Sequence, residues 1–217
     1  MKSIAVLSLL MLSAVCEPSV RSWDFENETA GLPPEGFYFD TTRDTTDGRW
    51  AIVKDGETQV LAQVDRNRNE HRFALAVVRE GLVEDLRLSV RLKAVAGDVD
   101  QTGGLIWRYR NSENYYLLRA DVSERKVRLY RVVNGNRIQF AHEENVNLLR
   151  NTWHVLKVEH AGEKIKAYLD DEMLFKVRDR TFQKKGKVGL WTQADAVTHF
   201  DDLRVEDLDA DGDDDGH

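Results

Sequence analysis

Apolar and polar residues alternate along most of this chain with the period of two that is typical of half-buried β-strands. The clearest case is residues 86–92, LRLSVRL, in which apolar side chains occupy every second position. Similar short runs recur along the sequence, at residues 36–40, 50–53, 60–64, 73–78, 104–110, 115–120, 127–133, 153–159, 165–169, 173–177, 188–192 and 198–205. No segment combines the period of an amphipathic helix with helix caps. The pattern therefore predicts an all-β protein.

Turn residues separate the runs. Asn134-Gly135 separates the run at 127–133 from a further short run at 137–140. Asn-Gly is the strongest short signal for a β-hairpin because both residues tolerate a positive φ. Asp170-Asp171 stands between two later runs in the same way and predicts a second two-residue hairpin. Many short strands at regular spacing, without an internal repeat or a linker, predict one antiparallel β-sandwich over residues 20–206.

The N-terminus has the composition of a secretory signal peptide. Lys2 precedes an apolar run at residues 4–12, and small residues lead up to Cys16. This pattern predicts cleavage after residues 1–16 and a secreted or periplasmic protein. The run is shorter than a membrane span of about 20 residues, so no transmembrane helix is expected. Lipidation of Cys16 is the alternative, which the bulky Val15 disfavours. Cys16 is the only cysteine, so the mature chain is expected to lack disulfides.

The negative charge is concentrated in the last eleven residues. The net charge is −7, and it becomes −8 once Lys2 leaves with the signal peptide. Residues 207–217 hold six Asp, which leaves about −2 on the remainder. We therefore expect an acidic disordered tail at 207–217, and no nucleic-acid partner, because no basic face is implied. The spacing of Asp207, Asp209 and Asp211 matches the opening of a calcium loop, but the glutamate that completes such a loop is missing. We expect a monomer.

Four segments carry a resemblance to a known fold: residues 102–121, 126–140, 153–175 and 186–205. They resemble the concanavalin A-like jelly-roll domains of secreted bacterial proteins, and most of all the 3-keto-disaccharide hydrolase group, also called family-16-glycoside-hydrolase-like. The resemblance implies a sandwich of two curved antiparallel sheets, the concave one commonly used for ligands. It does not settle function, because the fold serves lectins, glycosidases and adhesive modules.

Aromatic and charged residues crowd into the segment 102–121, TGGLIWRYRNSENYYLLRAD. Its period of two places Tyr116, Leu118 and Ala120 on a core face, so the alternate residues should point outward. Aromatic faces stack on sugar rings, while Arg and Asp hydrogen-bond hydroxyl groups. The pattern therefore predicts a carbohydrate-binding site. Its candidate residues are Trp107, Tyr115, Arg119, Asp121 and Trp191.

The face occupied by Trp107 is open at this stage. Alternation groups it with Leu105 and Tyr109, and groups Ile106 with Arg108 and Arg110. Either Trp107 and Tyr109 or the two arginines share the face of Tyr115. The competing interpretation places Trp107 in the core, with the arginines in cross-strand pairs.

Catalysis requires two carboxylates that flank a glycosidic bond. Family-16 enzymes carry theirs as Glu-x-Asp-x-(x)-Glu, which is absent here. Asp121, Glu159 and Asp195 are the carboxylates that could still lie on a sheet face. Three hypotheses remain: a secreted carbohydrate-binding module, a hydrolase or lyase acting on glycosides of the 3-keto-disaccharide type, and a structural envelope or adhesion protein.

Calcium is the one cofactor that the sequence suggests. Domains like those it resembles often hold a structural ion between the first and last strands, which makes Asp24, Glu26 and Asp201 candidate ligands. The resemblance places an opening strand at residues 23–26. Asp201 and Asp202 should point to opposite faces of the last strand. The alternative role for these acids is charge that protects an edge strand from aggregation.

Overall fold

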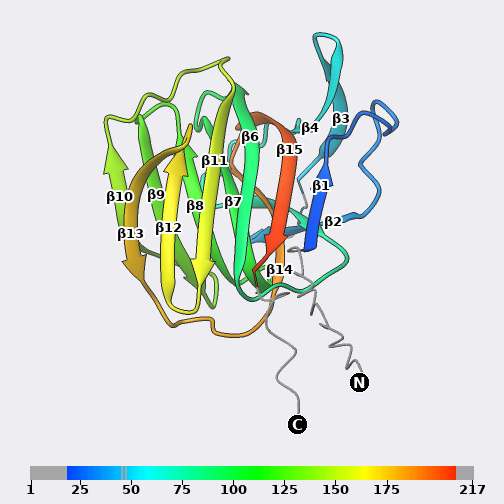
Figure 1. Cartoon of the computed structure of the whole chain (residues 1–217). Helices are drawn as coiled ribbons and strands as arrows, with labels where there is room; N and C mark the ends of the chain where they lie inside the picture. Colours follow the sequence, from blue (N-terminus) through cyan, green and yellow to red (C-terminus); the bar gives the residue numbers. More distant parts are fainter. Residues whose placement is uncertain (1–18, 45, 47, 209–217) are drawn as a thin grey trace, which may run out of the picture.

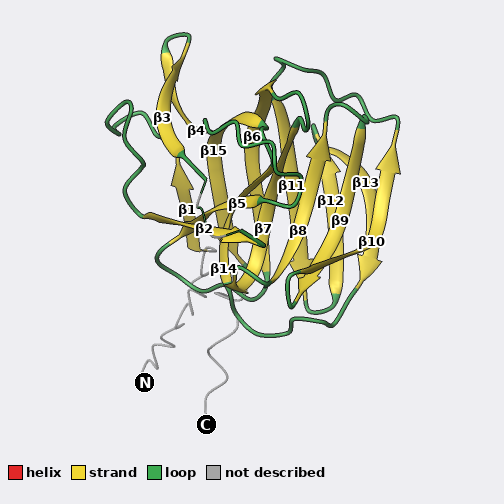
Figure 2. Ribbon diagram, turned by 180° about the vertical axis from the view of Figure 1, so that it is seen from behind, coloured by secondary structure: helices red, strands yellow, loops and turns green. Residues whose placement is uncertain are grey.

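The computed structural model describes residues 19–44, 46 and 48–208. Over these residues the chain forms fifteen strands and no helix. The strands build two antiparallel sheets that pack face to face (Figures 1 and 2). The predicted all-β sandwich is therefore confirmed. No described helix is long and apolar enough to cross a membrane.

The eight-stranded sheet has the order β13-β12-β11-β6-β15-β4-β3, with β1 paired to β15 (Figure 1). Its strands are β1 (Ser19–Trp23), β3 (Trp50–Asp55), β4 (Thr58–Gln63), β6 (Leu86–Ala96), β11 (His154–Ala161), β12 (Lys164–Leu169), β13 (Glu172–Arg178) and β15 (Val197–Asp207).

The seven-stranded sheet has the order β10-β9-β8-β7-β14-β5-β2 (Figure 2). Its strands are β2 (Phe37–Thr42), β5 (Phe73–Val78), β7 (Thr102–Asn111), β8 (Asn114–Asp121), β9 (Lys126–Val133), β10 (Asn136–Glu144) and β14 (Lys187–Gln193).

The hydrophobic core lies between the two sheets. Every second residue of β6 from Leu86 to Leu92 is buried there, as the alternation predicted. From the other sheet, Tyr116, Leu118 and Ala120 of β8 enter the same core. Burial of these apolar side chains is the main force that holds the sheets together.

Both predicted hairpins are confirmed. Asn134 and Gly135 have φ values of 48° and 73°, and they join β9 to β10. Asp170 and Asp171 join β12 to β13 with φ values of 48° and 65°. Positive φ at both central residues is the type I′ geometry, whose twist matches that of the flanking strands.

The seven-stranded sheet is strongly curled. The hollow side of the curl is the face that points away from the eight-stranded sheet. Its edges are β2 and β10, with five strands between them. Nevertheless, Nε of Arg43, the residue after β2, donates to the carbonyl of Gly135 in the β9–β10 turn, at 2.7 Å. Strands in a flat sheet lie about 4.8 Å apart, which would keep these edges more than about 20 Å apart. We call the side enclosed by this curl the concave face.

A second apolar cluster covers part of the concave face, separate from the main core. Its buried members are Phe73, Leu75, Val77, Ile106, Tyr109, Tyr115, Leu117, Val132 and Trp191. Residues on this side of a sheet would be solvated if the sheet were flat. The curl brings them together instead.

A β-bulge in β7 changes the predicted grouping of its side chains. Arg108 has a φ of 45°, and the pairing of β7 with β8 shifts register between Trp107 and Asn111. An inserted residue reverses the alternation that follows it. Tyr109 therefore lies on the concave face with Ile106, not with Trp107 as the simple period indicated.

Two predictions at the chain ends concern residues that the structure describes only in part. The predicted signal peptide at 1–16, with Cys16, lies outside the described residues. The last strand, β15, continues through Asp207, and residues 209–217 of the predicted tail again lie outside. The opening strand is β1, which ends at Trp23, so the expected strand at 23–26 was placed too late.

Candidate functional site

Four of the five predicted binding residues lie on the concave face, and one does not. Tyr115, Arg119 and Asp121 share this face of β8, and Trp191 of β14 lies on it beside Gly104 of β7. Trp107 belongs to the main core. The sequence therefore assigned the face of β8 correctly, but Trp107 of β7 does not share that face.

Trp107 is a structural residue. Its indole is fully buried, stacks on Tyr116 at 5.4 Å between ring centroids, and donates from Nε1 to Nδ1 of His160 at 2.8 Å. A ligand cannot reach it while the sheets are packed together. The bulge at Arg108 explains the error, because it separates Tyr109 from Trp107 and leaves Tyr109 alone to join Tyr115.

Tyr115 and Trp191 lie on the predicted face but are fully buried, so neither is the exposed platform that the alternation predicted. The Tyr115 hydroxyl lies 2.8 Å from Oγ1 of Thr42, and burial raises the pKa of Tyr115 to about 12. Trp191 stacks on Phe73 at 5.6 Å. Curling of the sheet has turned these rings into the second apolar cluster.

Arg137 of β10 covers this cluster, and the sequence analysis missed it. Its guanidinium carbon lies 4.1 Å from the centroid of Phe73, 5.5 Å from Tyr130 and 5.7 Å from Trp191. Nη1 donates to Oε1 of Gln193 at 2.9 Å. The register of the Asn134-Gly135 hairpin, which sets Arg137 opposite Val132 on the same face, was the signal that could have identified it.

A buried charge network lies next to Arg137. Arg119 donates from Nη2 to Oδ2 of Asp100 at 3.0 Å, and its Nη1 lies 3.1 Å from Oδ2 of Asp121. Asp121 also accepts from Nη1 of Arg128 at 3.1 Å, and Arg128 pairs in turn with Glu124. The predicted residues Arg119 and Asp121 are thus brought together, as anchors beneath the surface.

The two carboxylates of this network respond differently to burial. Burial would raise the pKa of Asp121, but Arg119, Ser123 and Arg128 outweigh it, so the pKa of Asp121 is lowered. Burial dominates for Asp100 and raises its pKa, although Arg119 acts in the opposite direction. The lowered pKa favours the ionised form of Asp121, and this carboxylate holds Arg119 and Arg128 in place.

Above this network lies an accessible layer that we call the β9–β10 surface. It consists of the concave-face side chains of β9 and β10 at one edge of the seven-stranded sheet, namely Arg128, Tyr130, Arg137, Gln139 and His142. Tyr130 is half-buried and stands opposite Gln139, and Arg128 stands opposite the exposed His142. The surface combines an accessible ring with arginines that are held from below.

The other candidate carboxylates lie apart from this surface. Glu159 is on the opposite side of the molecule, where it pairs with Arg87 and Lys166 of the eight-stranded sheet. Asp195 accepts hydrogen bonds from the backbone N–H groups of three successive residues, Asp98 to Asp100. Both acids stabilise local structure.

The predicted calcium ligands Asp24, Glu26 and Asp201 have hydrogen-bond partners within the protein, and calcium binding by them stays a prediction. Among the described residues, no group of three or more His, Cys, Asp or Glu side chains is arranged to hold a metal. Nη1 of Arg91 lies 3.3 Å from Asp201 and 3.2 Å from Asp202, so a guanidinium already supplies the positive charge there. The two acids reach one arginine because β15 is irregular between Asp201 and Arg204, which corrects the expectation of opposite faces.

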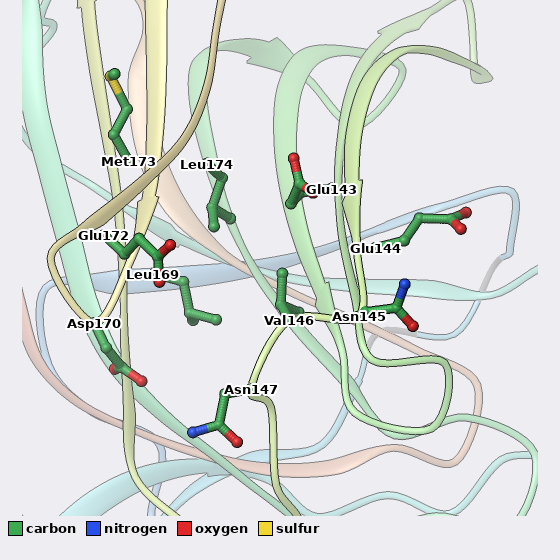
Figure 3. Close-up of a pocket in the computed structure, with 10 residues that line it drawn as sticks. All are labelled: Glu143, Glu144, Asn145, Val146, Asn147, Leu169, Asp170, Glu172, Met173 and Leu174. Atoms are coloured by element: carbon green, nitrogen blue, oxygen red, sulfur yellow. The ribbon is translucent and has the colours of Figure 1, made fainter.

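A cavity of about 540 Å³ opens between the edge strands β10 and β13 (Figure 3). Glu143 and Glu144 stand on one side of it, and Asp170 and Glu172 on the other. Asp170 pairs with His154, and Glu144 pairs with Lys126. None of the described polar side-chain atoms that are buried without a partner belongs to its walls, so the cavity presents no buried polar group that lacks a partner.

The two antiparallel sheets and the curled concave face define a lectin-type β-sandwich. Residues 50–208 match the family described as galactocerebrosidase, C-terminal lectin domain. Because this match spans well over half of the chain, the chain belongs to that family. The predicted concanavalin A-like jelly-roll class is confirmed, while the narrower likeness to the 3-keto-disaccharide hydrolase group stays a prediction. No curated protein sequence matches the chain.

Solved structures share the fold at low sequence identity. The carbohydrate-binding module CBM66 from Bacillus subtilis has a TM-score of 0.65 and 22% identity, over 77% of this chain and 94% of that one. The carbohydrate recognition domain of Emp47p has a TM-score of 0.60 and 12% identity, over 90% and 99%. Domain 4 of AbnA, an extracellular arabinanase from Geobacillus stearothermophilus in complex with arabinotriose, has a TM-score of 0.55 and 11% identity, over 88% and 93%.

Proposed function

We propose that this protein is a carbohydrate-binding module and that it binds its ligand on the β9–β10 surface of the concave face. The observation that carries the proposal is the position of Tyr130. Its half-buried ring lies between Arg128 and Arg137 on the concave face, and each arginine is held by a buried or half-buried partner, Asp121 or Gln193.

The chemistry of this surface fits a sugar ring. An accessible aromatic face packs against the C–H groups of a pyranose or furanose, and directed N–H donors bind its hydroxyl groups. Gln139 adds an amide that can both donate and accept. Because Arg128 is bonded from below to Asp121, its orientation is set before a ligand arrives.

The comparisons support a carbohydrate ligand. The family to which the chain belongs is described as a lectin domain, and two of the similar structures are named as a carbohydrate-binding module and a carbohydrate recognition domain. The third was solved with arabinotriose bound. These descriptions suggest the class of ligand and leave the particular sugar open.

The alternative function, a glycoside hydrolase, has one observation in its favour. Asp100 and Asp121 have pKa values shifted in opposite directions, as an acid–base pair requires. However, both carboxylates bind the same guanidinium, that of Arg119, which lies between them. A glycosidic bond and an attacking water need that space. We therefore favour binding without turnover.

We further propose that the protein is exported and acts as a monomer. The predicted signal peptide supports export. Cell fractionation, with N-terminal sequencing of the mature protein, tests cleavage after Cys16. Lipidation at Cys16 would instead place the protein in the membrane fraction. Size-exclusion chromatography with light scattering tests the oligomeric state.

Retention on a panel of immobilised glycans tests the proposed function. We expect wild-type protein to be retained on at least one glycan without turnover, and Tyr130→Ala to lose that retention. Tyr168→Ala is the matched control, since Tyr168 is also half-buried but lies in the eight-stranded sheet. Equal retention of both variants would remove the β9–β10 surface from the proposal. Release of product from any glycan or 3-keto-glycoside would favour the hydrolase.

A further inference from the structure

Arg137 is a partly buried cation without a carboxylate partner. Among the described residues, no Asp or Glu lies within ion-pair distance of the Arg137 guanidinium. Its hydrogen bond goes to the neutral amide of Gln193, and its remaining contacts are three aromatic rings. The other arginines of the concave face differ in this respect. Arg119 pairs with Asp100 and Asp121, and Arg128 pairs with Asp121 and Glu124.

A second positive charge adjoins Arg137. The guanidiniums of Arg119 and Arg137 both lie about 6 Å from the ring centroid of Trp191, at 6.0 and 5.7 Å. Burial lowers the pKa of Arg137, and repulsion from Arg119 lowers it further. The buried Nε of Arg119 also has no hydrogen-bond partner among the described residues. Asp100 and Asp121 pair with Arg119, so among these arginines only Arg137 lacks direct contact with a described acid.

A bound anion would give the guanidinium of Arg137 the ion pair that the described residues do not supply. Burying a charge is costly unless it is paired, and a guanidinium binds a carboxylate or sulfate through two parallel N–H···O bonds. Three aromatic rings pack against the guanidinium of Arg137, and Nη1 donates to Gln193, so its other N–H groups have no acceptor among the described residues. The ring centroid of Tyr130 lies 5.5 Å from the guanidinium carbon of Arg137. A sugar stacked on this ring would therefore bring its substituents to Arg137.

We propose that the ligand is an anionic carbohydrate, and that Arg137 binds its carboxylate or sulfate group. This inference rests on the proposed function, because it assigns the ligand class of the same surface. Tyr130 contacts the ring of the sugar, and Arg128, already neutralised by two acids, bonds to hydroxyl groups. Arg137 is then the residue that separates acidic from neutral sugars.

Matched pairs of glycans test this assignment. The probes are polygalacturonate against galactan, and a sulfated glycosaminoglycan against its desulfated form, with polyglutamate as a polyanion that lacks sugar. We expect wild-type protein to bind the acidic member of one pair at least tenfold more tightly, with an affinity that falls as salt rises. The preferred pair shows whether the anion is a carboxylate or a sulfate.

Variants of Arg137 provide the second arm. Arg137→Gln should lose the preference for the acidic member, while Arg137→Lys should retain part of it. Arg204→Gln, an exposed arginine on the other sheet, is the control. Thermal denaturation of each variant checks the fold, because Arg137 also covers the apolar cluster. Equal affinity for acidic and neutral members would overturn this assignment and leave the proposed function standing. Equal affinity for polyglutamate would overturn it as well, and failure to bind any glycan would instead reject the proposed function.

Discussion

The guanidinium of Arg137 lies over the ring of Phe73, with 4.1 Å between the guanidinium carbon and the ring centroid. These residues belong to β10 and β5, and four strands lie between them in the sheet order. Only a sheet that curls back on itself allows this contact. The curl encloses the second apolar cluster, and it leaves the β9–β10 surface as the accessible part of the concave face.

Replacement of Arg108 should strongly destabilise the fold. This fully buried arginine donates to the backbone carbonyls of Glu84, Phe182 and Gly162, and it pairs with Asp85. Arg108→Leu removes these bonds and takes their donor away from three backbone carbonyls, while Asp85 still accepts from the backbone N–H of Gly162. We expect the free energy of unfolding to fall by about 3–5 kcal/mol, measured by urea denaturation. Arg110→Leu, an exposed position on the same strand, should change it by less than about 1 kcal/mol. Similar losses for both variants would contradict this role.

Trp107 should matter for stability and not for ligand binding. Trp107→Phe removes the hydrogen bond to His160 and reduces the ring that packs on Tyr116. We expect a loss of about 1–3 kcal/mol in the free energy of unfolding. Glycan affinity, measured by titration calorimetry well below the melting temperature, should match that of wild type. A selective loss of affinity would return Trp107 to the binding site.

His160 should make the protein less stable in mild acid. Burial, followed by repulsion from Arg108, lowers the pKa of His160 to about 3, whereas a histidine in an unfolded chain titrates near 6.5. Between these values the unfolded state binds a proton that the folded state does not bind. The contribution of neutral His160 to the free energy of unfolding is therefore complete above pH 6.5 and is lost as the pH falls toward 3. We expect the free energy of unfolding to fall by about 1.4 kcal/mol per pH unit from this group.

Urea denaturation at pH 7 and pH 5 measures that slope. His160→Gln keeps an acceptor for the indole of Trp107 but cannot take up the proton, so its stability should depend less on pH. His142→Gln changes an exposed histidine of β10 and should preserve the wild-type slope. An unchanged slope in His160→Gln would exclude His160 as its source.

Calcium should not raise the melting temperature. Arg91 lies between the carboxylates of Asp201 and Asp202, and Glu26 accepts from the backbone N–H of Gln59. A divalent ion would have to displace the guanidinium before it could use these oxygens. Scanning calorimetry with millimolar calcium and with EDTA tests this expectation. A higher melting temperature in calcium would show that the acids rearrange around an ion.

The proposed binding site was partly predictable from the sequence. Alternation in β8 placed Arg119 and Asp121 on the correct face, since the period of two depends only on local backbone geometry. It could not show that Tyr115 would be covered on that face. Tyr130 and Arg137, the residues that the proposed site depends on, were overlooked, because their importance follows from contacts across the curled sheet.

The sequence by itself determined most of the strands, the two type I′ hairpins and the side chains of β6 and β8 that form the core. These features depend on local steric preferences and on hydrophobic periodicity. Only the tertiary structure decided which face each residue of β7 occupies, because the bulge at Arg108 interrupts the period. It also decided what covers the concave face. That choice arises from the curl of the seven-stranded sheet, which brings Arg137 and Phe73 together across four intervening strands.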